Sequence, residues 1–408
     1  MSSHATSHLF PVYSRAPLNF ERGVGCILFT SDGQSFLDFG SGVAVNCLGH
    51  AHPQLVDALQ RQAEKLWHVS NLYTVEGQEQ VAKRLCELTF ADRVFFCNSG
   101  TEAVELAIKA ARRYHHSRGD ISRNQIITLE GGFHGRTLGA LAATGRDEYL
   151  KGFEPRNPGF LQVPFGDFEE LESAVSEQTA GILLEPVQGE GGVRTIPCSY
   201  IRRVRELCDR HNVLMLLDEV QTGIGRTGRL FGYEESGVVP DIVAVAKGLG
   251  GGFPVGAVLA TESVGIAMQP GSHGSTFGGN PLAMSVAKVV LDIVSAPAFL
   301  ERVRMASIRL RKQAELLVSM YSLAFDGVTG AGLLVGLRCI PPVREVVNML
   351  YEQKLLCVPA GNNVLRLVPP LTVSDDEIDD AMRKIARVGK AICDMSVKRR
   401  KSLTDAAV

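Results

Sequence analysis

Lys247 ends an apolar, β-branched run and precedes a glycine-rich turn, in the stretch "DIVAVAKGLGGG" at residues 241–252. Such a run favours a buried strand, where a charged ammonium group is costly to desolvate. Burial or a nearby cation lowers the pKa of a lysine, and the neutral amine is a nucleophile towards carbonyl groups. A lysine at a strand end more often extends to solvent, so other motifs must decide between the two interpretations.

A second motif, "FFCNSGTEAVELAIKAAR", reads as a strand, a short turn and a helix. Ser99, Gly100 and Thr101 would place N–H groups and hydroxyls at the N-terminus of that helix, which favours an anion such as phosphate. An ordinary helix N-cap is the alternative, and this motif alone does not separate the two.

Further polar side chains follow other apolar runs. "VLMLLDEVQTG" ends on Asp218 and Glu219, and a carboxylate there can pair with a protonated ring nitrogen or cap the next turn. "LEGGFHGRT" supplies Phe133, which can stack on a planar ring, and Arg136, whose guanidinium suits a carboxylate. The other candidates, at a strand end or in a glycine-rich loop, are Glu185, Glu190, Ser275 and Thr276.

These parts together fit pyridoxal 5'-phosphate (PLP), with Lys247 bonded to its aldehyde carbon. The competing class is an NAD-dependent dehydrogenase, because Gly223, Gly225 and Gly228 match the dinucleotide-binding pattern G-x-G-x-x-G. That pattern should open a helix, and the following "RLFGYEESGVVPD" has no sustained helical periodicity. PLP is therefore the favoured cofactor.

Six short apolar runs alternate with amphipathic stretches between residues 93 and 265. This alternation predicts an α/β fold with a mainly parallel sheet, whose strands carry ligand-binding residues at their carboxyl ends. The runs are "RVFFCN", "QIITLE", "AGILLEP", "VLMLLDE", "DIVAVAK" and "GAVLA". One intervening helix is expected over residues 101–116.

The pattern of apolar and charged residues changes after residue 285, which predicts a smaller α+β domain. Its last helix should begin at Ser374, with Glu377 as the capping-box partner. We expect an N-terminal segment at 1–45 that packs with the small domain and contains a hairpin in "GCILFTSDGQSFLDF". The large PLP-binding domain then spans 46–285, the small C-terminal domain 286–395, and a frayed basic tail 396–408.

Composition points to small-molecule chemistry. The 42 Lys and Arg nearly balance the 44 Asp and Glu, so no overall field favours nucleic acid or a membrane surface. The N-terminus lacks the features of a signal peptide, no apolar stretch is long enough to span a bilayer, and the nine cysteines form no C-x-x-C pair. His50 and His52 have no further ligand at metal-site spacing, so we expect no metal. We expect a cytoplasmic protein with reduced, buried thiols.

The sequence resembles the class III, or ω-, aminotransferases over most of its length, and within them the acetylornithine aminotransferases. The motifs that carry the resemblance are "LDFGSGVAVNCLGHAHP", "FFCNSGTEAVELAIKAAR", "GGFHGRTLGALAATG", "LLEPVQGEGGV", "LLDEVQTGIGRTG", "AVAKGLGGGFPVGA" and "HGSTFGGNPLA". The phosphate motif reads "SGTEAVELA" where family members often read "SGAEANEAA", which should leave anion binding intact.

The resemblance implies fold type I of the PLP-dependent transferases, with a mainly parallel sheet of the seven-stranded type in the large domain, and a homodimer whose active sites lie at the subunit interface. It implies that PLP is bonded to Lys247, that Phe133 stacks on the ring and that Asp218 pairs with the pyridine nitrogen. Gln221 would approach the ring hydroxyl. The phosphate would be held by Ser99, Gly100 and Thr101, and by Thr276 of the neighbouring subunit, with Ser275 beside it.

The implied reaction moves the terminal amino group of N2-acetyl-L-ornithine to 2-oxoglutarate, giving N-acetyl-L-glutamate 5-semialdehyde and L-glutamate, a step of arginine biosynthesis. Arg136 would bind a substrate carboxylate, and Arg366 in "NVLRLVPP" the α-carboxylate of the keto acid. Glu190 would pair with Arg366 while the ω-amine reacts and then swing away. The alternative donors are ornithine, succinylornithine and 4-aminobutyrate, and Tyr13 and Arg15 are left without assigned roles.

Overall fold

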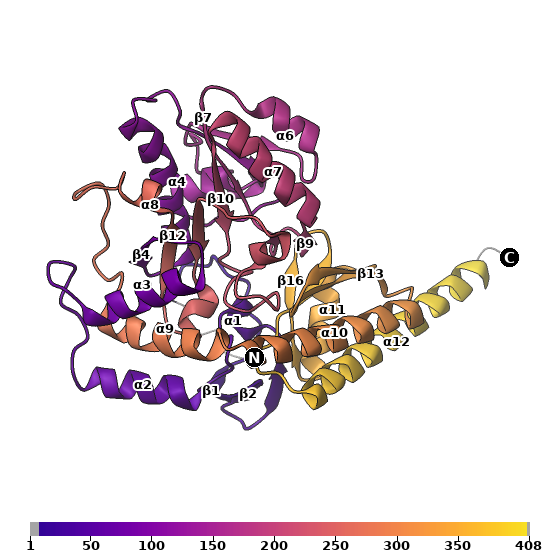
Figure 1. Cartoon of the computed structure of the whole chain (residues 1–408). Helices are drawn as coiled ribbons and strands as arrows, with labels where there is room; N and C mark the ends of the chain where they lie inside the picture. Colours follow the sequence, from indigo (N-terminus) through magenta and orange to yellow (C-terminus); the bar gives the residue numbers. More distant parts are fainter. Residues whose placement is uncertain (1–7, 406–408) are drawn as a thin grey trace.

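The computed structural model describes residues 8–405, with side chains up to residue 398, and its centre is a seven-stranded sheet (Figure 1). The strand order is β4-β12-β11-β10-β7-β5-β6. β12 runs antiparallel to β4 and β11, and the other pairs of neighbouring strands in this sheet are parallel. The strands are β4 (Arg93–Cys97), β5 (Gln125–Leu129), β6 (Phe160–Val163), β7 (Thr179–Leu184), β10 (Leu214–Asp218), β11 (Ile242–Val245) and β12 (Gly256–Ala260).

The predicted α/β fold with a mainly parallel sheet is confirmed, and each of the six apolar runs contains one of its strands. β7, β10, β11 and β12 are buried throughout, because helices cover both faces of the sheet. In β10, Leu214 and Leu216 pack in the same cluster as helix α4 (Gly100–Ser117). Met215 and Leu217 point to the opposite face, into the cluster that contains α7 (Cys198–His211). The remaining short helices around the sheet are α5 (Leu138–Ala143), α6 (Phe168–Ala174) and α8 (Glu262–Gly265).

Two four-stranded sheets lie outside the large one, and the first of them joins N-terminal strands to a C-terminal strand. One has the order β1-β2-β3-β15 and includes the predicted hairpin, and the other has the order β13-β14-β17-β16. Helices α10 and α12 lie side by side across this part of the molecule (Figure 1). The strands are β1 (Phe20–Val24), β2 (Ile27–Thr30), β3 (Ser35–Asp38), β13 (Phe325–Ala331), β14 (Leu334–Cys339), β15 (Leu355–Leu356), β16 (Val358–Ala360) and β17 (Val364–Leu367).

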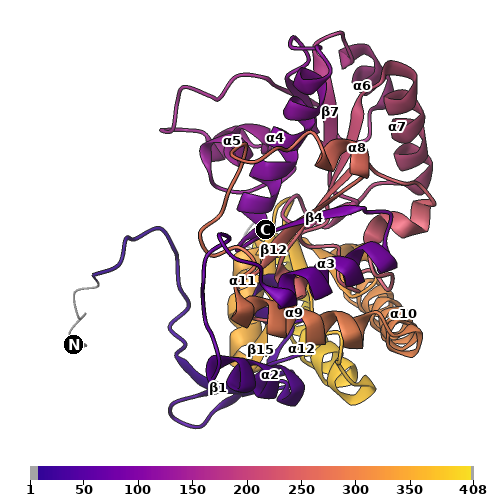
Figure 2. The same ribbon diagram turned by 60° about the vertical axis from the view of Figure 1, so that its left-hand side comes forward.

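The remaining elements connect these sheets or cover them. Figure 2 shows α2, α3 and α9 below the large sheet and the chain before β1 extending away from the body of the molecule. The helices are α1 (Ser41–Ala44), α2 (Pro53–Ala63), α3 (Glu76–Leu88), α9 (Pro281–Val294), α10 (Pro297–Met320), α11 (Val343–Glu352) and α12 (Asp375–Asp405). The short 3₁₀ helices are η1 (Asp147–Tyr149), η2 (Gly232–Ser236) and η3 (Lys247–Gly250), and the two-stranded sheet joins β8 (Val187–Gln188) to β9 (Arg194–Thr195).

The chain shows no break at two of the predicted domain boundaries. The step from 285 to 286 falls inside α9, and the step from 395 to 396 falls inside α12, which continues where we predicted a frayed tail. The predicted capping box is present, because Ser374 N donates to Glu377 Oε2 at 2.8 Å and Glu377 N donates to Ser374 Oγ at 3.3 Å. The pairing of β3 with β15 brings the N-terminal segment beside a C-terminal strand. The division into domains stays a prediction.

Two further observations bear on the expectations from composition. All nine cysteines are free, and six of them are buried. In the described part of the chain no single helix is long and apolar enough to cross a membrane. Helices α9 and α10, which meet at a bend of 72°, reach the necessary length and apolar composition only when they are taken together.

Candidate active site

One cavity of about 440 Å³ opens where β10 and β11 end and α4 begins. This is the edge of the sheet at which ligands were expected to collect. Most of the predicted site residues line it: Ser99, Gly100, Thr101, Phe133, Arg136, Glu190, Asp218, Gln221 and Lys247. Glu185, which had no assigned role, lines it too.

The N-terminus of α4 forms one wall of the cavity. Ser99 is the N-cap, and its Oγ accepts the N–H of Glu102 at 3.3 Å. A Cβ on Gly100 would lie 2.7 Å from Val220 Cγ1, so a residue without a side chain lets the helix start close to the loop after β10. The first amides of a helix have no acceptor within it, so this wall suits a phosphate.

Thr101 ties this wall to the loop after β5. Its Oγ1 accepts the backbone N–H of Arg136 at 3.3 Å and lies 3.0 Å from Thr137 Oγ1. The side chain that we predicted to hold phosphate therefore also fixes the loop that carries Phe133 and Arg136.

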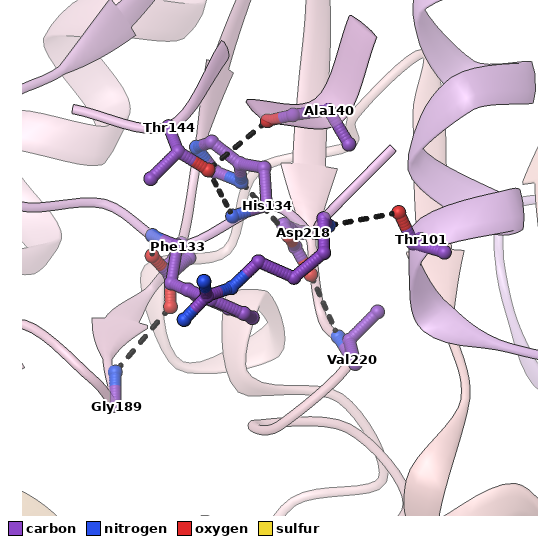
Figure 3. Close-up of polar contacts among 10 residues, drawn as sticks. Thr101, Phe133, His134, Ala140, Thr144, Gly189, Asp218 and Val220 are labelled. Atoms are coloured by element: carbon purple, nitrogen blue, oxygen red, sulfur yellow. Dashed lines mark hydrogen bonds and ion pairs between the residues drawn. The ribbon is translucent and has the colours of Figure 1, made fainter. Parts of the chain in front are cut away.

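Asp218 lies at the floor of the cavity with only 4% of its surface exposed. Its Oδ1 accepts the N–H of Val220 at 3.0 Å, and its Oδ2 is hydrogen-bonded to His134 Nδ1 at 2.9 Å (Figure 3). Burial lowers the pKa of His134, but the hydrogen bond and the charge of Asp218 outweigh burial and raise it above its ordinary value. The carboxylate is thus held in one orientation from two sides.

Glu185 lies behind Phe133. Its two carboxylate oxygens accept the N–H groups of Phe133 at 2.9 Å and of Gly189 at 3.3 Å. Burial raises the pKa of Glu185 to about 7, with the charge of Asp218 acting in the same direction and His134 against it. This side chain supports the backbone that positions the aromatic ring.

Lys247 begins η3 directly after β11, with a φ of 41°, which is unfavourable for a residue with a side chain. Neighbouring contacts hold the backbone in this state, among them a hydrogen bond of 3.1 Å from Cys47 Sγ to Gly248 O. Burial, and secondly the charge of Arg366, lower the pKa of Lys247 to about 8. A fraction of the amine is therefore in its neutral, nucleophilic form near neutral pH.

Arg366 reaches this region from β17 and is almost fully buried, with 1% of its surface exposed. Its Nη1 donates to Glu190 Oε1 at 2.6 Å and to Gln221 Oε1 at 2.9 Å. Burial raises the pKa of Glu190, but the charge of Arg366 dominates with its hydrogen bond, so the net pKa is lowered. Gln221 thus contacts Arg366, while its predicted approach to a ring hydroxyl stays a prediction.

The other predicted residues lie nearer the surface. Arg136 is exposed, and its guanidinium carbon stands 4.0 Å from the centre of the Tyr149 ring. Ser275 Oγ accepts N–H groups of the Asn98 side chain at 3.3 Å and of Gly278 at 2.9 Å. Thr276 is exposed and borders a separate small hollow, so within one chain it does not line the cavity.

Sequence reasoning missed His134, Asn98 and the pair Tyr149 and Arg146. His134 directly follows the aromatic residue in "GGFHGRT", which was the one usable signal. Asn98 lines the cavity beside the N-cap. The other two contact predicted residues only through the three-dimensional fold.

The competing expectations have less support in the fold. Gly223, Gly225 and Gly228 lie in a series of turns after β10, and the next element is the short η2 rather than an α-helix. No group of three metal-ligating side chains occurs among the described residues, and His50 Nε2 instead lies 2.7 Å from Asp38 Oδ2.

The chain matches the family described as Aminotransferase class-III over residues 11–388, and it belongs to that family. It is 52% identical over 399 residues to an acetylornithine aminotransferase from Agrobacterium fabrum, covering 98% of this chain and 99% of that protein. The N-acetylornithine aminotransferase from Stenotrophomonas maltophilia K279a is 37% identical, with a TM-score of 0.82 over 93% of this chain and 97% of that one.

A further solved structure, of the ornithine aminotransferase from Toxoplasma gondii, is 32% identical with a TM-score of 0.89, covering 94% of this chain and 92% of that one. That protein has partial occupancy of PLP at its active site. These matches confirm the predicted fold class, fold type I, and the predicted class of enzyme, an aminotransferase.

The residues around the cavity fit PLP. The phosphate would face the N-terminus of α4 at Gly100, the ring nitrogen would face the buried carboxylate of Asp218, and the aldehyde would face an amine of lowered pKa in Lys247.

Proposed function

We propose that this enzyme uses PLP to transfer the terminal amino group of N2-acetyl-L-ornithine to 2-oxoglutarate, forming N-acetyl-L-glutamate 5-semialdehyde and L-glutamate. The names of the similar proteins from Agrobacterium and Stenotrophomonas support this donor. The observation that carries the proposal is the 2.6 Å ion pair between Arg366 and Glu190, a residue that lines the same cavity as Lys247. The pair provides an arginine that can bind the keto acid, and Glu190 neutralises this arginine while an ω-amine reacts.

PLP supplies an aldehyde that takes over the amino group and an electron-withdrawing ring that stabilises negative charge on the adjacent carbon. The residues that would hold it are those at the start of α4 for the phosphate, Phe133 for the ring face and Asp218 for the ring nitrogen. The negative charge of Asp218 favours a protonated ring nitrogen, and its hydrogen bonds to His134 and Val220 keep it in place.

Lys247 acts as the base and acid of the reaction. Its amine, with a pKa of about 8, would remove a proton from the terminal carbon of the donor and deliver it to the carbon that was the aldehyde carbon of PLP. A pKa near the working pH suits both directions of proton movement, because both protonation states are populated.

Substrate binding uses two arginines. Arg136, exposed at the mouth of the cavity, binds the carboxylate of the donor. Arg366 binds the carboxylate next to the reacting carbon of 2-oxoglutarate once Glu190 has moved away. With Glu190 in place, Arg366 has no free charge to offer, and an α-amino acid is at a disadvantage relative to an ω-amine.

We further propose a cytoplasmic homodimer in which Thr276 of one subunit contacts the phosphate in the other. Support comes from the exposure of Thr276 outside the cavity of its own chain, beside Phe277, of which 59% is exposed. The division into a large domain at 46–285 and a small one at 286–395 belongs to the same proposal, since Arg366 comes from the second and Lys247 from the first.

A donor panel tests the function. Purified enzyme with PLP and 2-oxoglutarate is offered N2-acetylornithine, succinylornithine, ornithine and 4-aminobutyrate, and the glutamate formed is measured. We expect the highest kcat/KM for N2-acetylornithine. A tenfold preference for another donor would refute the assigned substrate, and glutamate formation that required a nicotinamide cofactor would refute the aminotransferase mechanism.

A further inference from the structure

Tyr149 is a neighbour of two arginines at the mouth of the cavity. The guanidinium carbon of Arg136 lies 4.0 Å from the centre of its ring, and that of Arg146 lies 5.5 Å from it. The Tyr149 hydroxyl accepts a hydrogen bond from Arg146 Nη1 at 3.1 Å. The ring also meets Phe133 edge-on, with centroids 6.1 Å apart. One side chain in η1 thus contacts three residues that border the site.

The guanidinium of Arg136 lies against aromatic rings. Among the side chains that the structure describes, no carboxylate forms an ion pair with it, and its guanidinium faces the rings of Tyr149 and Phe133. An exposed arginine has many rotamers, and ordering it on binding reduces affinity. An aromatic face limits those rotamers and leaves every N–H of the guanidinium free for a ligand.

Arg146 connects the same ring to the other arginine. Its Nη2 donates to the backbone oxygen of Glu190 at 2.6 Å, and the side chain of Glu190 pairs with Arg366. Tyr149 therefore lies between the exposed arginine and the segment that carries the carboxylate partner of the buried one.

We propose that Tyr149 is a positioning residue that sets affinity for the donor's carboxylate by holding the guanidinium of Arg136 over its ring. This rests on the proposed function, in which Arg136 binds that carboxylate. Tyr149 acts through Arg136 and does not touch the reacting atoms. The ring face is the essential feature, and the hydroxyl is secondary because it bonds to Arg146 instead.

The test compares two donors that differ only by the carboxylate: N2-acetylornithine and N-acetylputrescine. Tyr149→Leu should raise KM for N2-acetylornithine about three- to tenfold with little change in kcat, and leave N-acetylputrescine almost unchanged. Tyr149→Phe should resemble the wild type, since it keeps the ring, and Tyr149→His should be intermediate. Phe153→Leu, which removes another exposed ring from the same loop, is the matched control.

A binding measurement removes catalysis from the test. N2-acetylnorvaline carries the acetyl and carboxylate groups but no terminal amine, so its Kd by titration calorimetry reports the carboxylate contact without turnover. Tyr149→Leu should weaken it by the same three- to tenfold.

The outcomes separate the inference from the function on which it rests. Equal losses with both donors, or a Tyr149→Phe variant as impaired as Tyr149→Leu, would overturn the positioning role. If Arg136→Leu leaves the ratio of the two donors unchanged, the carboxylate role of Arg136 fails and the inference fails with it. A wild-type enzyme that uses neither donor refutes the proposed function itself.

Discussion

The floor of the cavity and its arginine side hold their charges in different ways. The floor consists of Lys247, Asp218, His134 and Glu185. Its carboxylates are buried and hydrogen-bonded to backbone N–H groups or to a histidine ring, which leaves them little freedom to move. Every group there is attached to or supported by the ends of the large sheet, so the floor is a rigid catalytic surface.

The arginine side consists of Arg136, Arg146 and Arg366 with Tyr149 and Glu190. Arg136 is exposed on an aromatic ring, whereas Arg366 is buried and neutralised by Glu190, whose side chain is 25% exposed. A carboxylate with access to solvent can leave its partner at lower cost than a buried one. Under the proposed function, this difference assigns the chemistry to immobile groups and the choice of substrate to exchangeable contacts. Substitutions on the floor should slow every donor alike, and substitutions on the arginine side should change ratios between substrates.

The largest effect is expected at Lys247. Lys247→Ala removes the only proton carrier proposed for the donor carbon, so kcat should fall on the order of 10⁴-fold or more for every donor. Borohydride reduction should fix the yellow colour of bound PLP on the peptide that contains residue 247 in the wild type and not in the variant. Lys288→Ala, at an exposed lysine paired with Asp292, is the control. Transamination by the Lys247→Ala variant at a near-normal rate would show that Lys247 is not the proton carrier.

A second test of the floor replaces the charge of Asp218 and keeps its shape. Asp218→Asn should lower kcat about 10²- to 10⁴-fold, because the ring nitrogen loses its anionic partner while the phosphate contacts at α4 remain. Steady-state rates with N2-acetylornithine and ornithine should fall by the same factor. A change in the ratio between the two donors would show that the floor also selects substrates.

On the arginine side, Glu190→Ala should change selectivity. Without its partner, Arg366 is free to bind the α-carboxylate of ordinary amino acids. The ratio of ω-amine to α-amine turnover should then fall about 10- to 100-fold, the range of a charge-assisted hydrogen bond. Glu190→Gln, which keeps an acceptor without the charge, should give a smaller decrease. An unchanged ratio in Glu190→Ala would mean that the ion pair does not act as a switch.

Much of the floor could be predicted from the sequence, because Lys247, Asp218 and Glu185 lie at the ends of buried strands, whereas His134 lies in the loop after β5. Lys247 and Asp218 end runs of Val, Ile, Leu and Met, and parallel strands bring their carboxyl ends to one edge. β6 was missed because "FLQV" is short, includes a polar residue and lies at the edge of the sheet, where burial is incomplete. The helix through residue 396 was missed because a basic run at a chain end was interpreted as a tail.

The arginine side could not be derived from local pattern. Arg366 comes from a different sheet than Lys247, and only the resemblance to a family associated them. Its contact with Gln221 and the contacts of Tyr149 with two arginines depend on how distant segments pack, which leaves no periodicity in the sequence. Glu185 was noticed at a strand end, yet its support of Phe133 N is a tertiary hydrogen bond.

The smallest expected effect tests whether charges on the arginine side change the pKa of Lys247 on the floor. Burial, and after it the charge of Arg366, lower the pKa of Lys247 to about 8, while the charge of Glu190 acts in the opposite direction. Since the neutral amine attacks the aldehyde, the rate at which cofactor-free enzyme takes up PLP should rise with pH through a midpoint near 8. Arg366→Met removes a cation and should move that midpoint up by roughly half a unit to one unit, while Glu190→Gln should move it down by a similar amount. A midpoint that rises in Arg366→Met and falls in Glu190→Gln would mean that the charges on the arginine side set the pKa of Lys247 as well as substrate choice. If neither midpoint moves, burial alone sets that pKa.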